Sequence, residues 1–150
     1  MPIDTLKSIV DYGVIGLLVV LSIVTFAYAF ERFNYFRKVN IRHYPNKKIL
    51  ELDLTHRLGA IATIGSSAPY IGLLGTVLAI ILTFYAIGEQ KGGIDTGEIM
   101  KHLALALKAT AAGLIVAIPA TVFYNILMDK ADRLMTQWEA YFGEQDRHNR

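Results

Sequence analysis

The sequence contains no cysteine and carries few charged side chains. Because cysteine is absent from its 150 residues, disulfide bonds, thiolate metal sites and thiol chemistry are excluded. Only 19% of the residues are charged, whereas 53% are hydrophobic. A soluble domain this small needs more polar surface than such a composition provides, so the composition argues against a soluble globular protein.

The hydrophobic residues are gathered into three runs that contain no charged residue, at positions 12–30, 58–88 and 109–128. A helix of about 20 apolar residues crosses the hydrocarbon core of a bilayer, and all three runs reach that length. A buried bundle in a soluble protein is the alternative, but two such long runs would leave too little polar surface to cover them. We therefore predict an all-α integral membrane protein with three transmembrane helices.

The first run could instead be a signal peptide, since Ala27-Tyr28-Ala29 resembles a small-x-small cleavage site. However, the run is longer than a typical signal-peptide core, and the positive charges follow it instead of preceding it. The first run is therefore interpreted as a membrane anchor.

The distribution of Lys and Arg predicts the orientation in the membrane. Seven basic residues lie between the first and second runs, whereas the hairpin that follows the second run (89–101) holds only Lys91 and, at its far edge, Lys101. Cytoplasmic segments carry the excess of positive charge, so the amino terminus is expected outside and the carboxyl terminus inside. The predicted segments are an external terminus (1–11), span one (12–30), a cytoplasmic basic segment (31–63), span two (64–88), an external hairpin loop (89–101), span three (102–128) and a cytoplasmic tail (129–150).

Apolar periodicity continues beyond the membrane on the cytoplasmic side. Leucine and isoleucine residues at 49–58 lead into span two without a proline, so we expect one continuous helix there. In the tail, Ala131, Leu134, Met135, Trp138 and Phe142 recur at three- and four-residue spacing, typical of an amphipathic helix. Spans two and three are thus predicted to extend into the cytoplasm as long helices. The tail could also lie flat on lipid, but its excess of acidic residues disfavours that alternative.

Small and weakly polar residues form a stripe on each of spans two and three. On span two, Pro69, Thr76 and Thr83 fall on one line, flanked by Gly65, Gly72 and Ala79, and Gly75 is a further small packing residue. On span three, Thr110, Ala117 and Thr121 fall on one line beside Gly113. Pro119 interrupts the same span. Such stripes serve close helix packing in many membrane proteins. Two matched stripes on helices joined by a short hairpin also indicate a shared polar cavity, and both interpretations remain open at this point.

No Asp or Glu lies within any of the three runs. A proton path through a membrane needs protonatable groups, and threonine hydroxyls cannot provide them. Any proton pathway here must therefore borrow its acid from another polypeptide. Lys108, the charged residue inside span three, lies about 160° around the helix from Thr110 at 100° per residue. We expect it to snorkel outward or to contact a neighbouring subunit.

The sequence shows no sign of an enzyme. The four histidines, at positions 43, 56, 102 and 148, form no metal-ligand spacing, and no nucleophile–base set or phosphate-binding glycine loop is present. We expect no catalytic residue, metal, cofactor or nucleic-acid partner.

Two segments resemble the MotA/TolQ/ExbB proton channel family. Residues 68–77 (APYIGLLGTV) are similar to the family's second-span motif, and residues 104–120 (ALALKATAAGLIVAIPA) with Tyr124 and Asn125 are similar to its third-span motif. The resemblance is greatest to the ExbB and TolQ members, since MotA-type stators have four spans and a larger cytoplasmic region.

The resemblance implies a pentamer in the bacterial inner membrane around a pore that encloses single-span helices of an ExbD-like partner. That partner would supply the proton-carrying Asp, and Thr76 and Thr110 match the pore-facing threonines. The complex would drive a TonB-like protein for import across the outer membrane. A TolQ-like role in envelope integrity and a non-conducting scaffold are the alternatives. This chain departs from the family pattern at Leu105, where many members have Glu, and at Lys108, commonly an apolar position.

Overall fold

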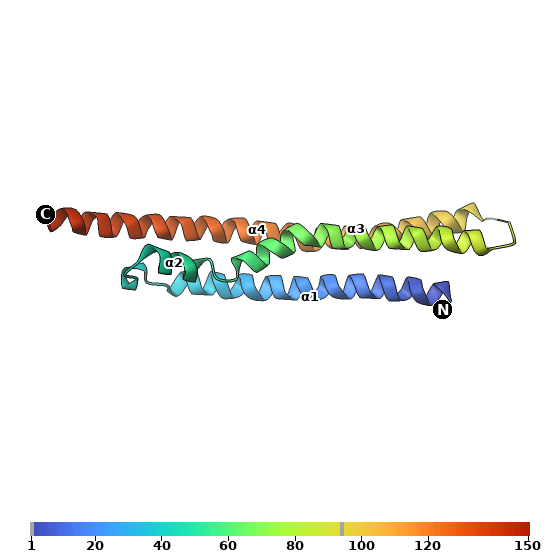
Figure 1. Ribbon diagram of the computed structural model, residues 1–150, viewed down its shortest axis with the longest axis horizontal. Coiled ribbons are helices and arrows are strands. Elements are labelled where there is room, and N and C mark those ends of the chain that lie inside the picture. The colour runs from blue at the N-terminus through green and yellow to red at the C-terminus, as the bar shows by residue number, and fades with distance from the viewer. Residues whose placement is uncertain (1, 94) are drawn as a thin grey trace.

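The computed structural model describes residues 2–93 and 95–150, and the described part is helical with no strand (Figure 1). Four α-helices follow one another as α1 (Ile3–Lys38), α2 (Lys47–Leu54), α3 (Leu58–Glu89) and α4 (Thr96–His148), with a short 3-10 helix, η1 (Ile41–His43), before α2. The all-α prediction is confirmed.

Helices α3 and α4 form an antiparallel hairpin, and α1 packs against both (Figure 1). Helix α3 ends at Glu89, and Asp95 caps the start of α4 by accepting a hydrogen bond from the Gly97 amide at 2.9 Å. Leu18 and Ala29 of α1, Ile61 and Ala68 of α3, and Ala120 of α4 belong to one buried cluster. The hairpin and α1 thus share a single core.

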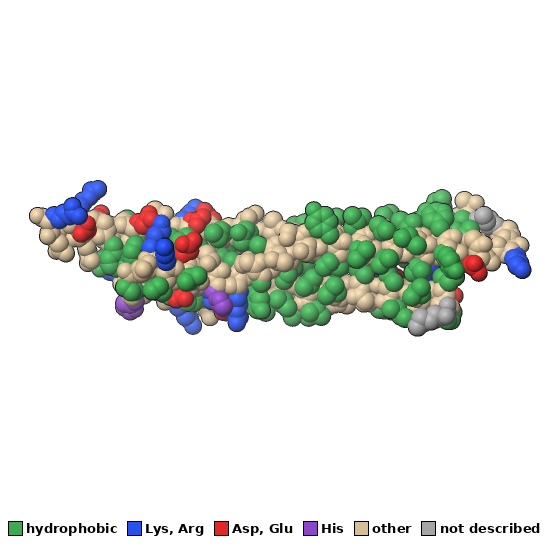
Figure 2. Space-filling model, in the orientation of Figure 1, with side chains coloured by type: hydrophobic (Ala, Val, Ile, Leu, Met, Phe, Trp, Pro, Cys, Tyr) green, Lys and Arg blue, Asp and Glu red, His purple; other side chains and the backbone are tan. Residues whose placement is uncertain are grey.

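Large apolar side chains cover the outside of the three long helices. Among them, Phe30, Tyr70 and Ile115 are each more than 70% exposed. Charged side chains gather toward the two ends of the molecule, while the middle is a hydrophobic belt (Figure 2). Each long helix is also apolar enough over 18 residues to cross a bilayer. The chain is therefore an integral membrane protein with three candidate spans, as predicted.

Two helices extend beyond the predicted spans, and one helix that the sequence predicts as continuous is broken. Helix α1 already begins at Ile3, inside the predicted external terminus, and α4 begins at Thr96, inside the predicted hairpin loop. The expectation of one helix through residues 49–58 is wrong, because α2 ends at Leu54 and α3 begins at Leu58. Arg57 lies between them in the left-handed conformation, with φ 65°. Beyond this break α2 lies along α4 as α3 does, and its Leu50 and Leu54 are buried in a cluster with Ala131 and Met135 of α4.

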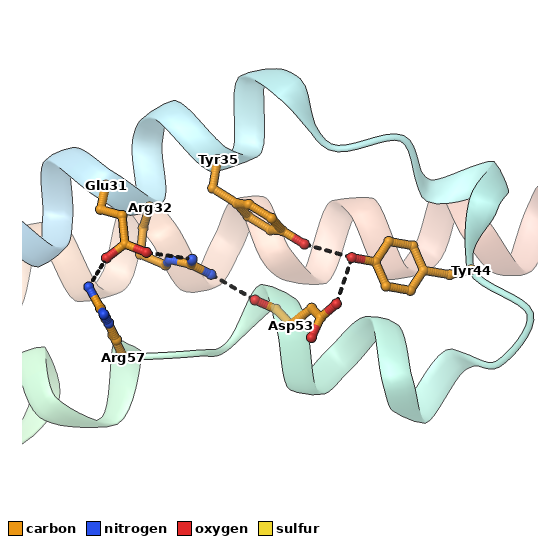
Figure 3. A network of polar contacts seen from close by, with 6 residues as sticks. All are labelled: Glu31, Arg32, Tyr35, Tyr44, Asp53 and Arg57. Carbon is orange, nitrogen blue, oxygen red and sulfur yellow. Dashed lines mark hydrogen bonds and ion pairs between the residues drawn. The ribbon is translucent and has the colours of Figure 1, made fainter.

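A polar network surrounds this break at the α2 end of the molecule (Figure 3). The Arg32 guanidinium is 5% exposed and donates through Nη1 to the Asp53 carbonyl at 2.7 Å. Glu31 pairs with both Arg32 and Arg57. Tyr44 donates to the Asp53 carboxylate at 2.7 Å. Burial, with the hydrogen bonds to Tyr35 and Asp53, raises the pKa of the Tyr44 phenol, so it remains a donor at neutral pH.

The amphipathic tail prediction is confirmed, since α4 runs without interruption from Thr96 to His148. Trp138 donates from its indole to the Tyr44 carbonyl at 2.9 Å, and Lys47 of α2 pairs with Glu139 of α4. The tail therefore packs on α2 instead of bending away at the end of the span.

Candidate functional site

The closest approach of α3 and α4 is a crossing of two glycines. A Cβ atom on Gly72 would lie 2.6 Å from the Ala109 carbonyl oxygen, and one on Gly113 would lie 2.6 Å from the Ala68 carbonyl oxygen. Real Cβ atoms do not come that close, so both positions need glycine. This contact brings the small stripes of the two spans face to face.

One turn from this crossing, the stripes place two threonine hydroxyls in contact. Thr76 is only 5% exposed, and its Oγ1 lies 2.5 Å from Oγ1 of the half-buried Thr110. Thr76 Oγ1 also lies 2.9 Å from the Ala106 carbonyl oxygen. Since a hydroxyl has one proton, Thr76 can donate to Ala106 while Thr110 donates to Thr76. The arrangement is a directed hydrogen-bond pair in the apolar middle of the chain.

Thr83 lies two helical turns from Thr76 toward the turn at residues 90–95. It is 3% exposed, and its hydroxyl donates to the Ala79 carbonyl of its own helix at 2.8 Å. A small cavity of about 40 Å³ opens beside it, large enough for water. Thr83 of α3 shares this cavity with polar side chains of α1, of α4 and of the segment between α3 and α4, which are Lys7, Gln90, Asp95, Glu98 and His102. The threonine line thus reaches a polar chamber at the end of α3.

Ala117 and Thr121 lie on the other side of the crossing, toward the α2 end. Ala117 is buried, whereas Thr121 is exposed. Both line a groove of about 310 Å³ between α3 and α4, together with Gly65 and Pro69. No residue of α1 lines this groove, so it faces away from the core of the chain.

The two prolines lie inside continuous helices. Pro69 is within α3 and Pro119 is within α4, and both are half-buried. A proline cannot donate to the carbonyl four residues earlier, so each helix loses one backbone hydrogen bond at that level. Gly75, the other glycine named for helix packing in span two, lies against Ala109 and against Val14 of α1.

Lys108 is separated from the threonine pair. It lines a cavity of about 410 Å³ whose other lining residues all belong to α1: Lys7, Ser8, Asp11, Tyr12 and Ile15. Its ammonium group therefore lies on the α1 side of α4. Leu105, at the position where many family members have Glu, is exposed on the outside of the molecule.

The sequence predicts a stripe with Thr76 and a stripe with Thr110, but it does not predict the contact between these two hydroxyls. It also missed the polar network of Arg32, Tyr44 and Asp53, because those residues belong to three separate elements. The one available signal was Arg32 itself, since an arginine close behind a span needs a partner if it is buried.

The fold and the central threonine pair define the class: a helical membrane protein with three candidate spans, whose charge-free runs carry a buried pair of hydroxyls and no carboxylate. Residues 36–140 match the MotA/TolQ/ExbB proton channel family, and the chain belongs to that family. It is 52% identical over 141 residues to a protein of Aquifex aeolicus (strain VF5) named biopolymer transport protein ExbB, covering 94% of this chain and 95% of that protein.

Two relatives from Helicobacter pylori are similar over nearly their whole length. A putative biopolymer transport protein ExbB-like 2 of strain 26695 is 52% identical over 136 residues, covering 91% of this chain and 90% of the relative. A biopolymer transport protein ExbB of strain J99 is 46% identical over 129 residues, covering 86% and 88%. The family resemblance drawn from the two motifs is thus confirmed.

Proposed function

We propose that this chain is the channel-scaffold subunit of an inner-membrane complex that uses the proton gradient to drive import across the outer membrane. The observation that carries the proposal is the Thr76–Thr110 hydroxyl pair, set in a bundle whose spans contain no carboxylate. Family membership and the ExbB names of its relatives support it.

In this proposal the protons are carried by an Asp on a single-span, ExbD-like partner. Thr110 is the member of the pair with exposed surface, so it would offer its oxygen to that carboxyl group. Thr76 lies behind it and fixes the direction of its hydroxyl. On either side of this pair, the same path would be lined by Thr83, Gly113, Ala117 and Thr121. Homo-oligomerisation, as a pentamer, would enclose the partner and couple it to a TonB-like protein.

The charge distribution supports an amino terminus in the periplasm and a carboxyl terminus in the cytoplasm. The α2 end and the α4 tail hold most of the basic residues, and positive charge is retained on the cytoplasmic side. A TolQ-like role in envelope integrity would use the same pore with another partner. Growth on scarce iron after deletion, compared with sensitivity to detergents, separates the two roles.

A second candidate, a non-conducting scaffold, is favoured by one observation. Thr76 is almost fully buried within a single chain and is satisfied there, as a residue that only packs helices would be. The two candidates differ in what they demand of the hydroxyl group. Conduction needs its oxygen and proton, whereas packing needs only its volume.

The decisive experiment is a complementation assay with Thr76→Val, Thr110→Val and the double variant. Valine keeps the volume but removes the hydroxyl, so the channel proposal expects energy-dependent uptake to fall sharply while expression and oligomer size are kept. A hydrogen bond in a membrane bundle is worth about 0.6 kcal/mol on average, so stability should change little. Thr→Ser at either position keeps the hydroxyl, so it should reduce uptake less than Thr→Val does.

Thr25→Val is the matched control. Thr25 is a buried threonine of α1, 1% exposed, whose hydroxyl donates to the Leu21 carbonyl of its own helix at 2.9 Å. It should tolerate valine with normal uptake. Full activity of the double Thr76/Thr110 variant would refute the channel assignment and leave the scaffold.

A further inference from the structure

A groove between α1 and α4 at the α2 end of the molecule combines aromatic walls with basic side chains. It has a volume of about 260 Å³ and is lined by Phe33, Phe36 and Arg37 of α1 and by Lys130, Arg133 and Leu134 of α4. The Lys130 ammonium lies 4.8 Å from the centre of the Phe33 ring. Three positive charges thus share one partly apolar hollow.

These charges are not neutralised from within the chain. Arg133 pairs with Asp129 at 3.1 Å, but among the described residues no carboxylate lies within ion-pairing distance of Arg37 or Lys130. With Asp129 counted, the groove keeps an excess of two positive charges. An anion would therefore find both charge and hydrogen-bond donors there, and the guanidinium of Arg37 suits a phosphate group in particular.

The groove lies at the depth of lipid headgroups. The charge-free runs end at Phe30 and Met128. At about 1.5 Å per residue, Lys130 lies about 3 Å beyond its run and Arg37 about 10 Å beyond its own. The headgroup region on each side of the hydrocarbon core is about 5–8 Å thick, so the groove overlaps it.

An apolar track leads from the groove into the membrane. Phe26, Phe30 and Phe33 follow one another on one face of α1, and the rings of Phe26 and Phe33 contact Phe123 of α4 at centroid distances of 5.3 and 6.2 Å. Phe26 and Phe30 remain 52% and 77% exposed. This surface gives an acyl chain a continuous apolar contact, which a free phosphate ion would not use.

We propose that this groove binds the phosphate group of an anionic phospholipid, with Arg37 and Lys130 contacting the headgroup and the aromatic residues contacting an acyl chain. The site lies apart from the threonine pair and does not depend on proton conduction. A bound lipid would fill the space between α1 and α4 at the level where the two helices leave the membrane.

The test is native mass spectrometry of the purified chain, titrated with phosphatidylglycerol, phosphatidylcholine or glycerol phosphate. The test variant is Arg37→Gln with Lys130→Gln. The control is Lys38→Gln with Lys48→Gln, which removes the same charge from exposed residues outside the groove. Each basic residue near an anionic lipid surface raises the binding affinity about fivefold. Losing two should therefore weaken phosphatidylglycerol binding about 30-fold. The control should bind as the unchanged protein does, and Lys130→Arg alone should keep binding.

Four results would overturn the proposal. If phosphatidylglycerol binding were weakened equally in the test and control variants, the lipid would be held only by diffuse attraction to positive charge. Equal affinity of the unchanged protein for phosphatidylcholine would show an apolar contact without headgroup recognition. Competition by glycerol phosphate at lipid-like concentrations would show a site for a free anion. Loss of oligomers in the test variant with lipid binding retained would show that the groove is a contact between protein chains.

Discussion

At the scale of single residues, the crossing of Gly72 and Gly113 determines how close α3 and α4 can come. Each glycine faces a backbone carbonyl of the other helix at a distance that leaves no room for a methyl group. The same proximity brings the Thr76 and Thr110 hydroxyls within hydrogen-bonding distance. The crossing is therefore a condition for the threonine pair as well as for packing.

Gly113→Ala should destabilise the protein by about 1–3 kcal/mol, the usual cost of forcing an extra methyl group into a packed contact. A lower thermal unfolding midpoint in detergent would show this. Gly143→Ala, on the same helix, is the control, because a Cβ at Gly143 would meet no atom within 4 Å. It should be neutral or slightly stabilising, since alanine is the better helix former. Equal effects of the two changes would contradict the role of the crossing.

At the scale of elements, the short helix α2 depends on tertiary contacts for its stability. It has 8 residues, too few for a stable isolated helix. Leu50 and Leu54 are both fully buried in a cluster with α4, and Arg32 donates to the carbonyl of Asp53 near the end of α2. Docking on α4 and the polar network together keep α2 folded.

Leu50→Ala should loosen α2, because truncating a fully buried leucine costs about 2–5 kcal/mol. Limited proteolysis should then cut residues 39–57 faster than in the unchanged protein. Leu52→Ala is the matched control in the same helix, since Leu52 is 71% exposed. If both variants were cut at the same rate, packing of Leu50 would not be what holds the segment.

The elements differ in how far the sequence predicts them. The three spans follow from charge-free runs, and the α4 tail follows from apolar periodicity, because both signals are local. The break at residues 55–57 could not be predicted in this way. Arg57 adopts its left-handed conformation while contacting Glu31 and the ring of Tyr28, residues far earlier in the chain. Likewise, the stripes indicated which residues share a face, but not that Thr76 would meet Thr110.

At the scale of the whole molecule, we predict that the purified chain forms a homo-oligomer, with the pentamer as the expected size. The groove beside Pro69, Ala117 and Thr121 faces away from the chain's own core, which leaves that surface for another chain. Native mass spectrometry in mild detergent should show the assembly. Monomers alone would count heavily against the prediction.

We also predict that this chain conducts protons poorly by itself, because its spans contain no carboxylate. Liposomes containing the chain alone should show a proton flux near that of empty liposomes under an imposed pH gradient. Liposomes that contain the chain together with an ExbD-like partner should show a higher proton flux. Rapid flux through the chain alone would contradict the need for a borrowed acid and direct attention to Lys108.

Helix α4 has a mechanical consequence. At about 1.5 Å per residue, its 53 residues extend about 80 Å, well over twice the thickness of the hydrocarbon core. One rod thus joins the polar chamber at one membrane surface to Trp138 and the α2 contact beyond the other. If the rod tilts by about 5° about one end, the far end moves by about 7 Å. With the pivot at Thr96, Thr110 lies about 21 Å along this lever and would move by about 2 Å, so the tail would enlarge a small shift at the threonine pair about fourfold.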